Sequence, residues 1–206
     1  MRVVDLTHPI SDGLPVYFPW HPKTTLTQTA NYKDNLCLVQ CLSIGTHSGT
    51  HIDAPSHVLE GGTTLDHYDP GLWYREAMVL DFTPREPSQE ITEDDLKARF
   101  SEQGMAVIIK TGWDKVFGRE EYYKTYPALT NKAAEFLVEA QVPVVAADTP
   151  FKLDVHYTLL RQGIPLITNI NNTDQLRAGK VKLIAAPLLI QGGDGAPARV
   201  LALVDY

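Results

Sequence analysis

Three histidines and one aspartate lie within segment 45–57, which reads GTHSGTHIDAPSH. Imidazole and carboxylate ligands together suit zinc, manganese or ferrous iron, and a cluster without cysteine does not resemble a structural zinc site. A single histidine is more often an ordinary surface or hydrogen-bonded loop residue. Three of them beside a carboxylate, in a frame that contains glycine, instead predict a divalent metal site.

The spacing of these residues sets a geometric condition on that site. Side chains alternate along a strand and residues are about 3.3 Å apart, so His51 and Asp53 share a face whereas His47 lies about 13 Å from His51. A helix would bring the two histidines together, but glycine, β-branched residues and a proline in the segment disfavour one. We therefore expect the chain to bend between His47 and His51, at Gly45 and Gly49, because glycine adopts backbone conformations that other residues avoid.

Short apolar runs bounded by glycine or proline predict a domain in which strands dominate. Three helices are expected, the first with a capping-box-like start at Thr92 and Asp95 and the second with Thr130 as N-cap. The sequence contains no repeat and no long polar linker, so we predict a single mixed α/β domain over residues 1–206. The expected strands are Val3–Leu6, Leu36–Ile44, Ala77–Phe82, Ala106–Thr111, Val142–Ala147, Leu166–Ile170, Val181–Ile190 and Arg199–Val204, and the expected helices are Glu93–Phe100, Asn131–Ala140 and His156–Arg161.

The composition is that of an ordinary globular protein. The 206 residues include 44% hydrophobic and 21% charged side chains, which excludes a disordered, collagen-like or coiled-coil chain. A chain of this length buries about 70% of its unfolded surface, so a metal ion is not needed for folding and would serve catalysis. The net charge of −7 argues against nucleic acid or an anionic membrane as a partner.

The sequence also predicts a compartment. The first residues contain no apolar stretch of signal-peptide length, and no window approaches the roughly 20 apolar residues of a membrane span. Cys37 and Cys41 would lie about 13 Å apart on a strand, whereas the Cα atoms of a disulfide are about 4.4–6.8 Å apart. We expect a cytoplasmic protein in which both cysteines are inert packing residues.

Segment 47–57 resembles the HxGTHxDxPxH motif of the cyclase family, whose best-known members are bacterial kynurenine formamidases. Residues 4–11 (VDLTHPIS), residues 163–165 (GIP) and the stretch from Pro187 to Arg199 also resemble family signatures. The resemblance implies a swivelling β/β/α fold, action on amide or lactone-like carbonyls, and a homodimer or larger homo-oligomer. It further implies that His47, His51 and Asp53 hold a first metal ion, that Asp53 bridges to a second, and that His57 donates and accepts protons.

The chain departs from the formamidases at one metal ligand. Their two-metal site is completed by a later histidine, which His156 matches, and by a glutamate twelve residues further on, where this chain has Thr168. Threonine cannot act as an anionic ligand, so a second cation is weakened far more than the first. We therefore expect one divalent metal per chain, zinc or manganese with iron left open, and His57 and His156 free for proton transfer. In this respect the chain resembles the isatin hydrolases of the same family, which are single-metal enzymes that open a cyclic amide.

These features predict a metal-dependent hydrolase that cleaves a C–N bond in a small aryl amide or cyclic amide. A metal with three protein ligands keeps an open position for water, lowers the pKa of that water and polarises the substrate carbonyl. His57 lies beyond Pro55 and is placed to protonate the departing nitrogen. A lactone or ester hydrolase, a true cyclase and a non-catalytic metal-binding protein remain as alternatives.

Aromatic residues near the N-terminus are candidates for substrate binding. Tyr17 and Trp20, with Phe18, could form a wall against a planar substrate, with ordinary core packing as the competing explanation. The formamidases have tryptophan where this chain has Tyr17, so the motif does not fix the substrate. The remaining polar candidates are expected to be incidental: His8, His21 and His67 as unpartnered histidines, Glu60 as a solvated loop residue, and Asp194 as a turn residue.

Overall fold

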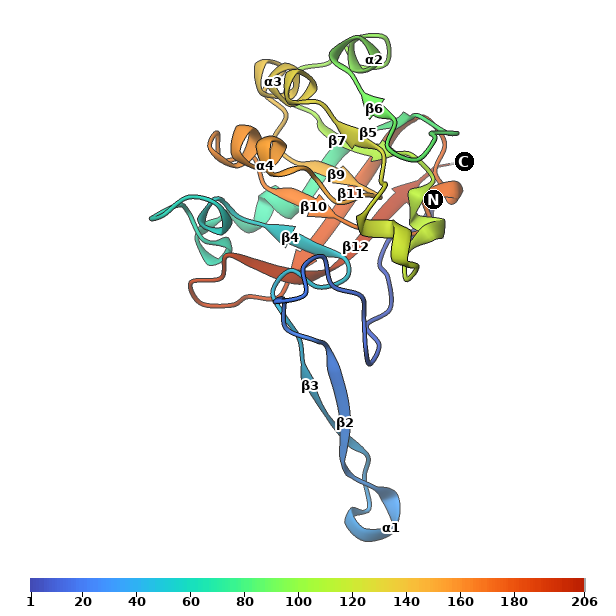
Figure 1. The fold of residues 1–206 in the computed structure, drawn as a ribbon, viewed down its shortest axis with the longest axis vertical. Helices are drawn as coiled ribbons and strands as arrows, with labels where there is room; N and C mark the ends of the chain where they lie inside the picture. Colours follow the sequence, from blue (N-terminus) through green and yellow to red (C-terminus); the bar gives the residue numbers. More distant parts are fainter. Residues whose placement is uncertain (206) are drawn as a thin grey trace.

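An eight-stranded sheet organises the protein (Figure 1), whose structure, a computed structural model, describes residues 1–205. The strand order is β1-β12-β11-β5-β7-β9-β10-β4, and β4 also pairs with β12, so the sheet closes on itself like a barrel. Neighbours among β5, β7, β9 and β10 run parallel, and the other pairs are antiparallel. The strands are β1 (Arg2–Asp5), β4 (His51–Asp53), β5 (Tyr74–Asp81), β7 (Ala106–Lys110), β9 (Val145–Ala147), β10 (Leu166–Thr168), β11 (Gly179–Pro187) and β12 (Gly195–Val204).

Three α-helices cover the outer face of the parallel strands (Figure 1): α2 (Glu93–Lys97), α3 (Asn131–Glu139) and α4 (Leu153–Leu160). The central strand β7 shows why its sequence is apolar throughout. Val107 and Ile109 pack in the cluster under the helices, whereas Ile108 lies in the second cluster, which fills the closed sheet. A strand that is covered on both faces needs a continuous apolar run.

Shorter elements connect this frame. A two-stranded parallel sheet joins β6 (Glu90–Ile91) to β8 (Ala128–Leu129). Among residues 1–205 no helix is long and apolar enough to cross a membrane. The 3-10 helices are η1 (Pro55–His57), η2 (Leu65–His67), η3 (Pro70–Trp73), η4 (Trp113–Val116), η5 (Glu120–Tyr123) and η6 (Thr173–Gln175).

The predicted mixed α/β domain is confirmed, and each predicted strand overlaps an observed one. The capping box of Thr92 and Asp95 is present at α2, and Thr130 caps α3. The predicted start of the third helix at His156 is wrong, because α4 begins at Leu153. That first turn carries no sequence signal, since Lys152 provides no side-chain cap and Leu153 is exposed.

A hairpin projects far from the body of the protein (Figure 1). It consists of β2 (Thr25–Ala30), α1 (Tyr32–Asn35) and β3 (Val39–Ser43), and β2 pairs antiparallel with β3. We refer to residues 25–43 as the arm. The prediction that Cys37 and Cys41 are packing residues is wrong, because both are exposed free thiols on the arm.

Candidate metal centre and its pocket

Strand β4 positions the first two candidate ligands. Its alternation directs Ile52 into the core, while His51 and Asp53 face the pocket. A turn precedes the strand, in which Gly49 has a φ of 61°, and it returns His47 to the same place. The predicted bend between His47 and His51 is therefore confirmed, with Gly49 as the residue whose backbone requires glycine.

The Asp53 carboxylate lies at the centre of the cluster, and its side chain is 1% exposed. Its Oδ1 lies 2.7 Å from His47 Nδ1 and 3.2 Å from His51 Nε2, and its Oδ2 lies 3.3 Å from His156 Nε2. Burial alone would raise the pKa of Asp53, but the surrounding imidazoles, His51 foremost, hold it well below its usual range. A buried ionised carboxylate is therefore surrounded by nitrogen atoms from three imidazole rings.

In two of these rings the second nitrogen forms a hydrogen bond with a backbone carbonyl. His51 Nδ1 lies 2.8 Å from the Gly49 oxygen and His156 Nδ1 lies 3.0 Å from the Lys152 oxygen, so both Nδ1 atoms donate a proton. In the neutral ring each Nε2 then directs a lone pair at a carboxylate oxygen, which is repulsive unless a cation or a further proton lies between them. Ring nitrogens held in this way are characteristic of metal-binding histidines. The residues therefore fit a divalent cation.

Asp194 holds the third ring. Its Oδ2 lies 2.9 Å from His47 Nε2, and the Gly192–Gly195 turn that carries it lies beside β4 because Gly195 pairs with Asp53. A Cβ on Gly195 would lie 2.5 Å from the His47 ring, so only glycine fits beneath this histidine. The prediction that Asp194 serves only turn geometry is wrong. Its signal was the Gly-Gly-Asp-Gly motif, but the contact requires a strand pairing that joins distant parts of the chain.

The charges of these residues reinforce one another. Burial lowers the pKa of His47, but hydrogen bonds to Asp194 and Asp53 outweigh that effect and raise it to about 9. Reciprocally, the bond from His47 holds the pKa of Asp194 far below its usual range. Without a metal, His47 is therefore protonated at neutral pH, and a cation that uses its Nδ1 must displace that proton.

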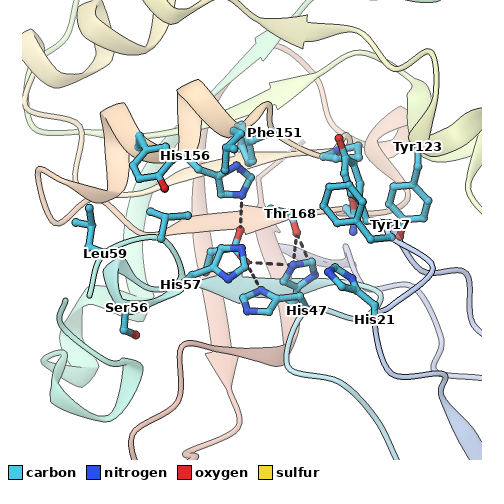
Figure 2. A pocket seen from close by; sticks show the side chains of 18 of the residues that line it. Tyr17, His21, His47, Ser56, His57, Leu59, Tyr123, Phe151, His156 and Thr168 are labelled. Atoms are coloured by element: carbon cyan, nitrogen blue, oxygen red, sulfur yellow. Dashed lines mark hydrogen bonds and ion pairs between the residues drawn. The ribbon is translucent and has the colours of Figure 1, made fainter. Parts of the chain in front are cut away.

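His57 and His156 complete the cluster from two further elements (Figure 2). His57 ends η1, its ring centroid lies 3.8 Å from that of His47, and its Nδ1 lies 3.7 Å from Asp194. With 27% of its side chain exposed, against 13% for His47 and 14% for His156, it is the more accessible ring. The donor atoms of Asp53, His57 and His156 also lie close enough to hold a cation, as do those of His47, His57 and Asp194.

Thr168 lies on β10 beside β4, where it pairs with His51 in the sheet register. Its Oγ1 is 3.0 Å from both nitrogens of the His51 ring, and the residue is 3% exposed. The hydroxyl thus occupies the edge of the cluster where a carboxylate would otherwise add negative charge. Asp53 is the one fully buried carboxylate in the three possible metal-binding groups of the described residues.

An apolar pocket of about 640 Å³ opens above the cluster, within the range of small-molecule sites. Tyr17 and Trp20, the two candidate substrate-binding residues, both line it, and Phe18 stacks on Trp20 with 5.2 Å between ring centroids. Tyr17 is held by a 3.2 Å hydrogen bond between its hydroxyl and that of Tyr126. Sequence analysis missed several lining residues that come from distant elements: Tyr123, Phe151, Leu153 and Tyr157.

The remaining histidines have different environments. His21, expected to be incidental, lines the pocket and packs edge-on against Trp20. His8 is buried and stacked on Phe117, and burial lowers its pKa to about 4. His67 is exposed beside Asp66. Of these three described histidines, only His21 belongs to the pocket.

The family described as "Putative cyclase" matches residues 4–153. The chain belongs to the cyclase family. A kynurenine formamidase of Salinibacter ruber is 28% identical over 98% of this chain and 97% of that protein. An isatin hydrolase of Roseibium aggregatum is 31% identical over 99% of this chain and 92% of its own.

Solved structures of related proteins share the fold over nearly the whole chain. An isatin hydrolase bound to the product analogue thioisatinate has a TM-score of 0.90 at 26% identity, covering 99% of this chain and 92% of that one. A structure described as a potential metal-dependent hydrolase with cyclase activity has a TM-score of 0.80 at 28% identity, covering 98% and 96%. The predicted family, fold and enzyme class, a metal-dependent hydrolase of C–N bonds, are confirmed.

Proposed function

We propose that this cyclase-family protein hydrolyses the C–N bond of a small aryl amide or cyclic amide at the cluster around Asp53. One observation carries the proposal: a buried, ionised carboxylate lies at the floor of an aromatic pocket and faces the Nε2 atoms of His51 and His156. Both rings have their other nitrogen bonded to a backbone carbonyl. This arrangement suits a cation beside a substrate-sized cavity.

The proposed ligands are His47, His51 and Asp53, and the proposed cofactor is one zinc or manganese ion per chain. When bound, such an ion lowers the pKa of a water molecule and polarises the substrate carbonyl. The negative charge in the cluster supports a single ion. Asp53 is the carboxylate of two possible metal-binding groups, one with His47 and His51 and one with His57 and His156, and Thr168 adds no charge to either. Asp194 would keep His47 oriented through the Nε2–H bond.

His57 is the proposed proton donor to the departing nitrogen, and it is the catalytic residue we favour. It borders the pocket, is the most exposed of the four clustered rings, and lies within 3.7 Å of the Asp194 carboxylate. A positioned acid of this kind contributes about 10²–10⁴-fold to a rate. His156 is proposed to assist proton transfer from the opposite side of Asp53, where its Nε2 lies 3.3 Å from Oδ2.

The substrate class follows from the pocket wall and the relatives. Tyr17 and Trp20 offer aromatic faces and edges against which a planar ring can pack. The relatives named kynurenine formamidase and isatin hydrolase support an aryl formamide or a fused cyclic amide as substrate. A lactone or ester hydrolase and a true cyclase are the competing activities at the same site.

Replacing His57 tests the proposed mechanism. His57→Ala should retain its metal, because the proposed ligands are untouched, while turnover of isatin or an aryl formamide falls by about 10²–10⁴-fold. His67→Ala, which removes an exposed histidine outside the pocket, is the matched control and should leave turnover unchanged. Unchanged turnover in His57→Ala would remove the acid role and favour a different donor. Retained metal with no turnover of any substrate by the unmodified protein would favour a non-catalytic metal-binding protein.

Two further features stay predictions. A homodimer or larger homo-oligomer follows from the family resemblance. A cytoplasmic location is supported by the two cysteines, both of which are free thiols.

A further inference from the structure

Asn169 lines the pocket but has no part in the metal binding or proton transfer proposed above. It directly follows β10, is 2% exposed, and has a φ of 57°, a backbone conformation in which asparagine is enriched over most other residues. Each of its polar groups, on the main chain and on the side chain, has a hydrogen-bond partner within the protein. Asn169 therefore acts on the site through the groups that it holds.

Two of these bonds hold the turn that leads into His51. Asn169 Nδ2 donates to the carbonyl oxygen of Gly49 over 3.0 Å, and the Asn169 carbonyl accepts from Thr50 Oγ1 over 2.7 Å. Gly49 and Thr50 are the two residues that directly precede His51. A glycine backbone has more conformational freedom than that of any other residue, so contacts from outside the turn are needed to keep the Gly49 carbonyl in one orientation.

The Gly49 oxygen connects Asn169 to the cluster. This oxygen also accepts the 2.8 Å hydrogen bond from His51 Nδ1. A carbonyl oxygen has two lone pairs, and here one is used by Asn169 and the other by His51. The hydrogen bond made by one histidine nitrogen decides which nitrogen is free for a metal. A Gly49 oxygen that is held in place therefore keeps His51 Nε2 directed at Asp53, whose Oδ1 is 3.2 Å away.

The orientation of the Asn169 amide is fixed by the partners on its two sides. A backbone carbonyl can only accept a hydrogen bond, so the amide nitrogen must face Gly49 and the amide oxygen must face Tyr122. The Tyr122 hydroxyl lies 3.0 Å from that amide oxygen, and the Tyr122 side chain is fully buried. Burial raises the pKa of Tyr122 well above its usual range, so the hydroxyl keeps the proton that it donates.

We propose that Asn169 is a positioning residue for the metal: through the Gly49 carbonyl it holds the His51 ring in the orientation and tautomer that leave Nε2 free for the ion. This role rests on the proposed function, in which His51 is a metal ligand. Replacing a group that orients a metal-binding histidine typically lowers metal affinity or activity about 10–100-fold. Because Asn169 acts on His51 through a carbonyl, we expect a loss at the lower end of that range, about tenfold.

The zinc affinities of two matched asparagine variants test this role. Asn169→Gly removes the side chain but retains the carbonyl and a residue that accepts a positive φ. Asn172→Gly is the control, because Asn172 has a φ of 53° and also donates from Nδ2 to a backbone carbonyl, that of Asp5 at 2.8 Å, but does not line the pocket.

In competition with a fluorescent chelator, zinc should bind Asn169→Gly about tenfold more weakly than the unmodified protein, whereas Asn172→Gly should bind it with unchanged affinity. An unchanged affinity in Asn169→Gly, or an equal loss in both variants, would overturn the proposal.

The visible absorption spectrum of cobalt-loaded protein tests how the ligand is held. Co²⁺ binds to the same kinds of nitrogen and oxygen ligands as Zn²⁺, and its visible absorption depends on how those ligands are arranged. At saturating Co²⁺ the spectrum of Asn169→Gly should differ from that of the unmodified protein, whereas the spectrum of Asn172→Gly should match it. An identical spectrum in Asn169→Gly would contradict the positioning role.

Tyr122→Phe is a milder second variant, and it carries the test if Asn169→Gly does not fold. It keeps Asn169 and removes only the hydroxyl that orients the amide, so zinc affinity should fall by less than in Asn169→Gly. If Asn169→Gly does not fold, an unchanged zinc affinity in Tyr122→Phe would overturn the proposal. None of these measurements uses turnover. A protein that binds neither zinc nor cobalt would refute the proposed metal site, whereas metal binding that is unaffected by Asn169 would refute only the positioning role.

Discussion

Replacing Asp194 by asparagine should weaken metal binding in a manner that depends on pH. The substitution removes the charge that faces His47 Nε2 at 2.9 Å while retaining a side chain of the same shape. A hydrogen bond to a charged group contributes about 1.5–3 kcal/mol, and the 43% exposure of Asp194 reduces its contribution to the lower end of that range. Since about 1.4 kcal/mol is a factor of ten, Asp194→Asn should bind the metal about tenfold more weakly.

The proton on His47 decides the pH at which this loss is seen. The pKa of His47 is raised to about 9 without a metal, so at pH 7 a cation must replace the proton on this ring. Asp194 stabilises the protonated ring as well as the metal-bound ring. Part of the effect of Asp194 then cancels. At pH 9.5 the ring is mostly neutral, and the tenfold loss should appear almost in full.

Competition between the protein and a fluorescent chelator, at buffered metal concentrations and at both pH values, measures this difference. Asp174→Asn is the matched control, since it removes a carboxylate that is 62% exposed and paired with Lys115 outside the pocket. An affinity that is unchanged in Asp194→Asn at pH 9.5, or a loss larger at pH 7 than at pH 9.5, would refute the role given to this carboxylate.

Two further predictions concern stability. In metal-free protein, the pKa of His47 is raised from 6.5 to about 9, so the protonated ring stabilises the fold fully below about pH 6.5. This stabilisation is lost as the pH rises through 9, by at most about 3 kcal/mol. Urea unfolding of chelated protein across this pH range measures the loss, and a free energy of unfolding that does not change with pH would contradict the pairing of His47 with two carboxylates. Tyr122→Phe removes a buried hydroxyl that donates to the Asp148 carbonyl or the Asn169 side chain, which should cost about 1–3 kcal/mol in urea unfolding; an unchanged free energy of unfolding would mean that water replaces these bonds.

The part of the site that is local in sequence could be predicted from the sequence. His51 and Asp53 share a face because they are two residues apart on a strand, and the bend that returns His47 is evident from Gly49. Asp194 could not be placed in this way, because it reaches His47 only through the pairing of β12 with β4. The aromatic wall around Phe151 likewise depends on how distant loops fold together.

The fold was predictable where an element's sequence pattern matches the burial of its faces or where a capping residue marks its start. The apolar run of β7 and the capped starts of α2 and α3 identified those elements closely. A strand at residues 36–44 was predicted and β3 lies within it, but its projection into solvent was not predictable, because the alternation of its residues is that of a half-buried strand.

Removal and return of the metal tests the central claim most directly. Protein treated with a chelator should lose hydrolysis of isatin and of aryl formamides, and one equivalent of zinc or manganese per chain should restore it, with a plateau at that ratio. Hydrolysis that persists without metal would contradict the account. Restoration that requires two equivalents would contradict the single ion assigned to His47, His51 and Asp53.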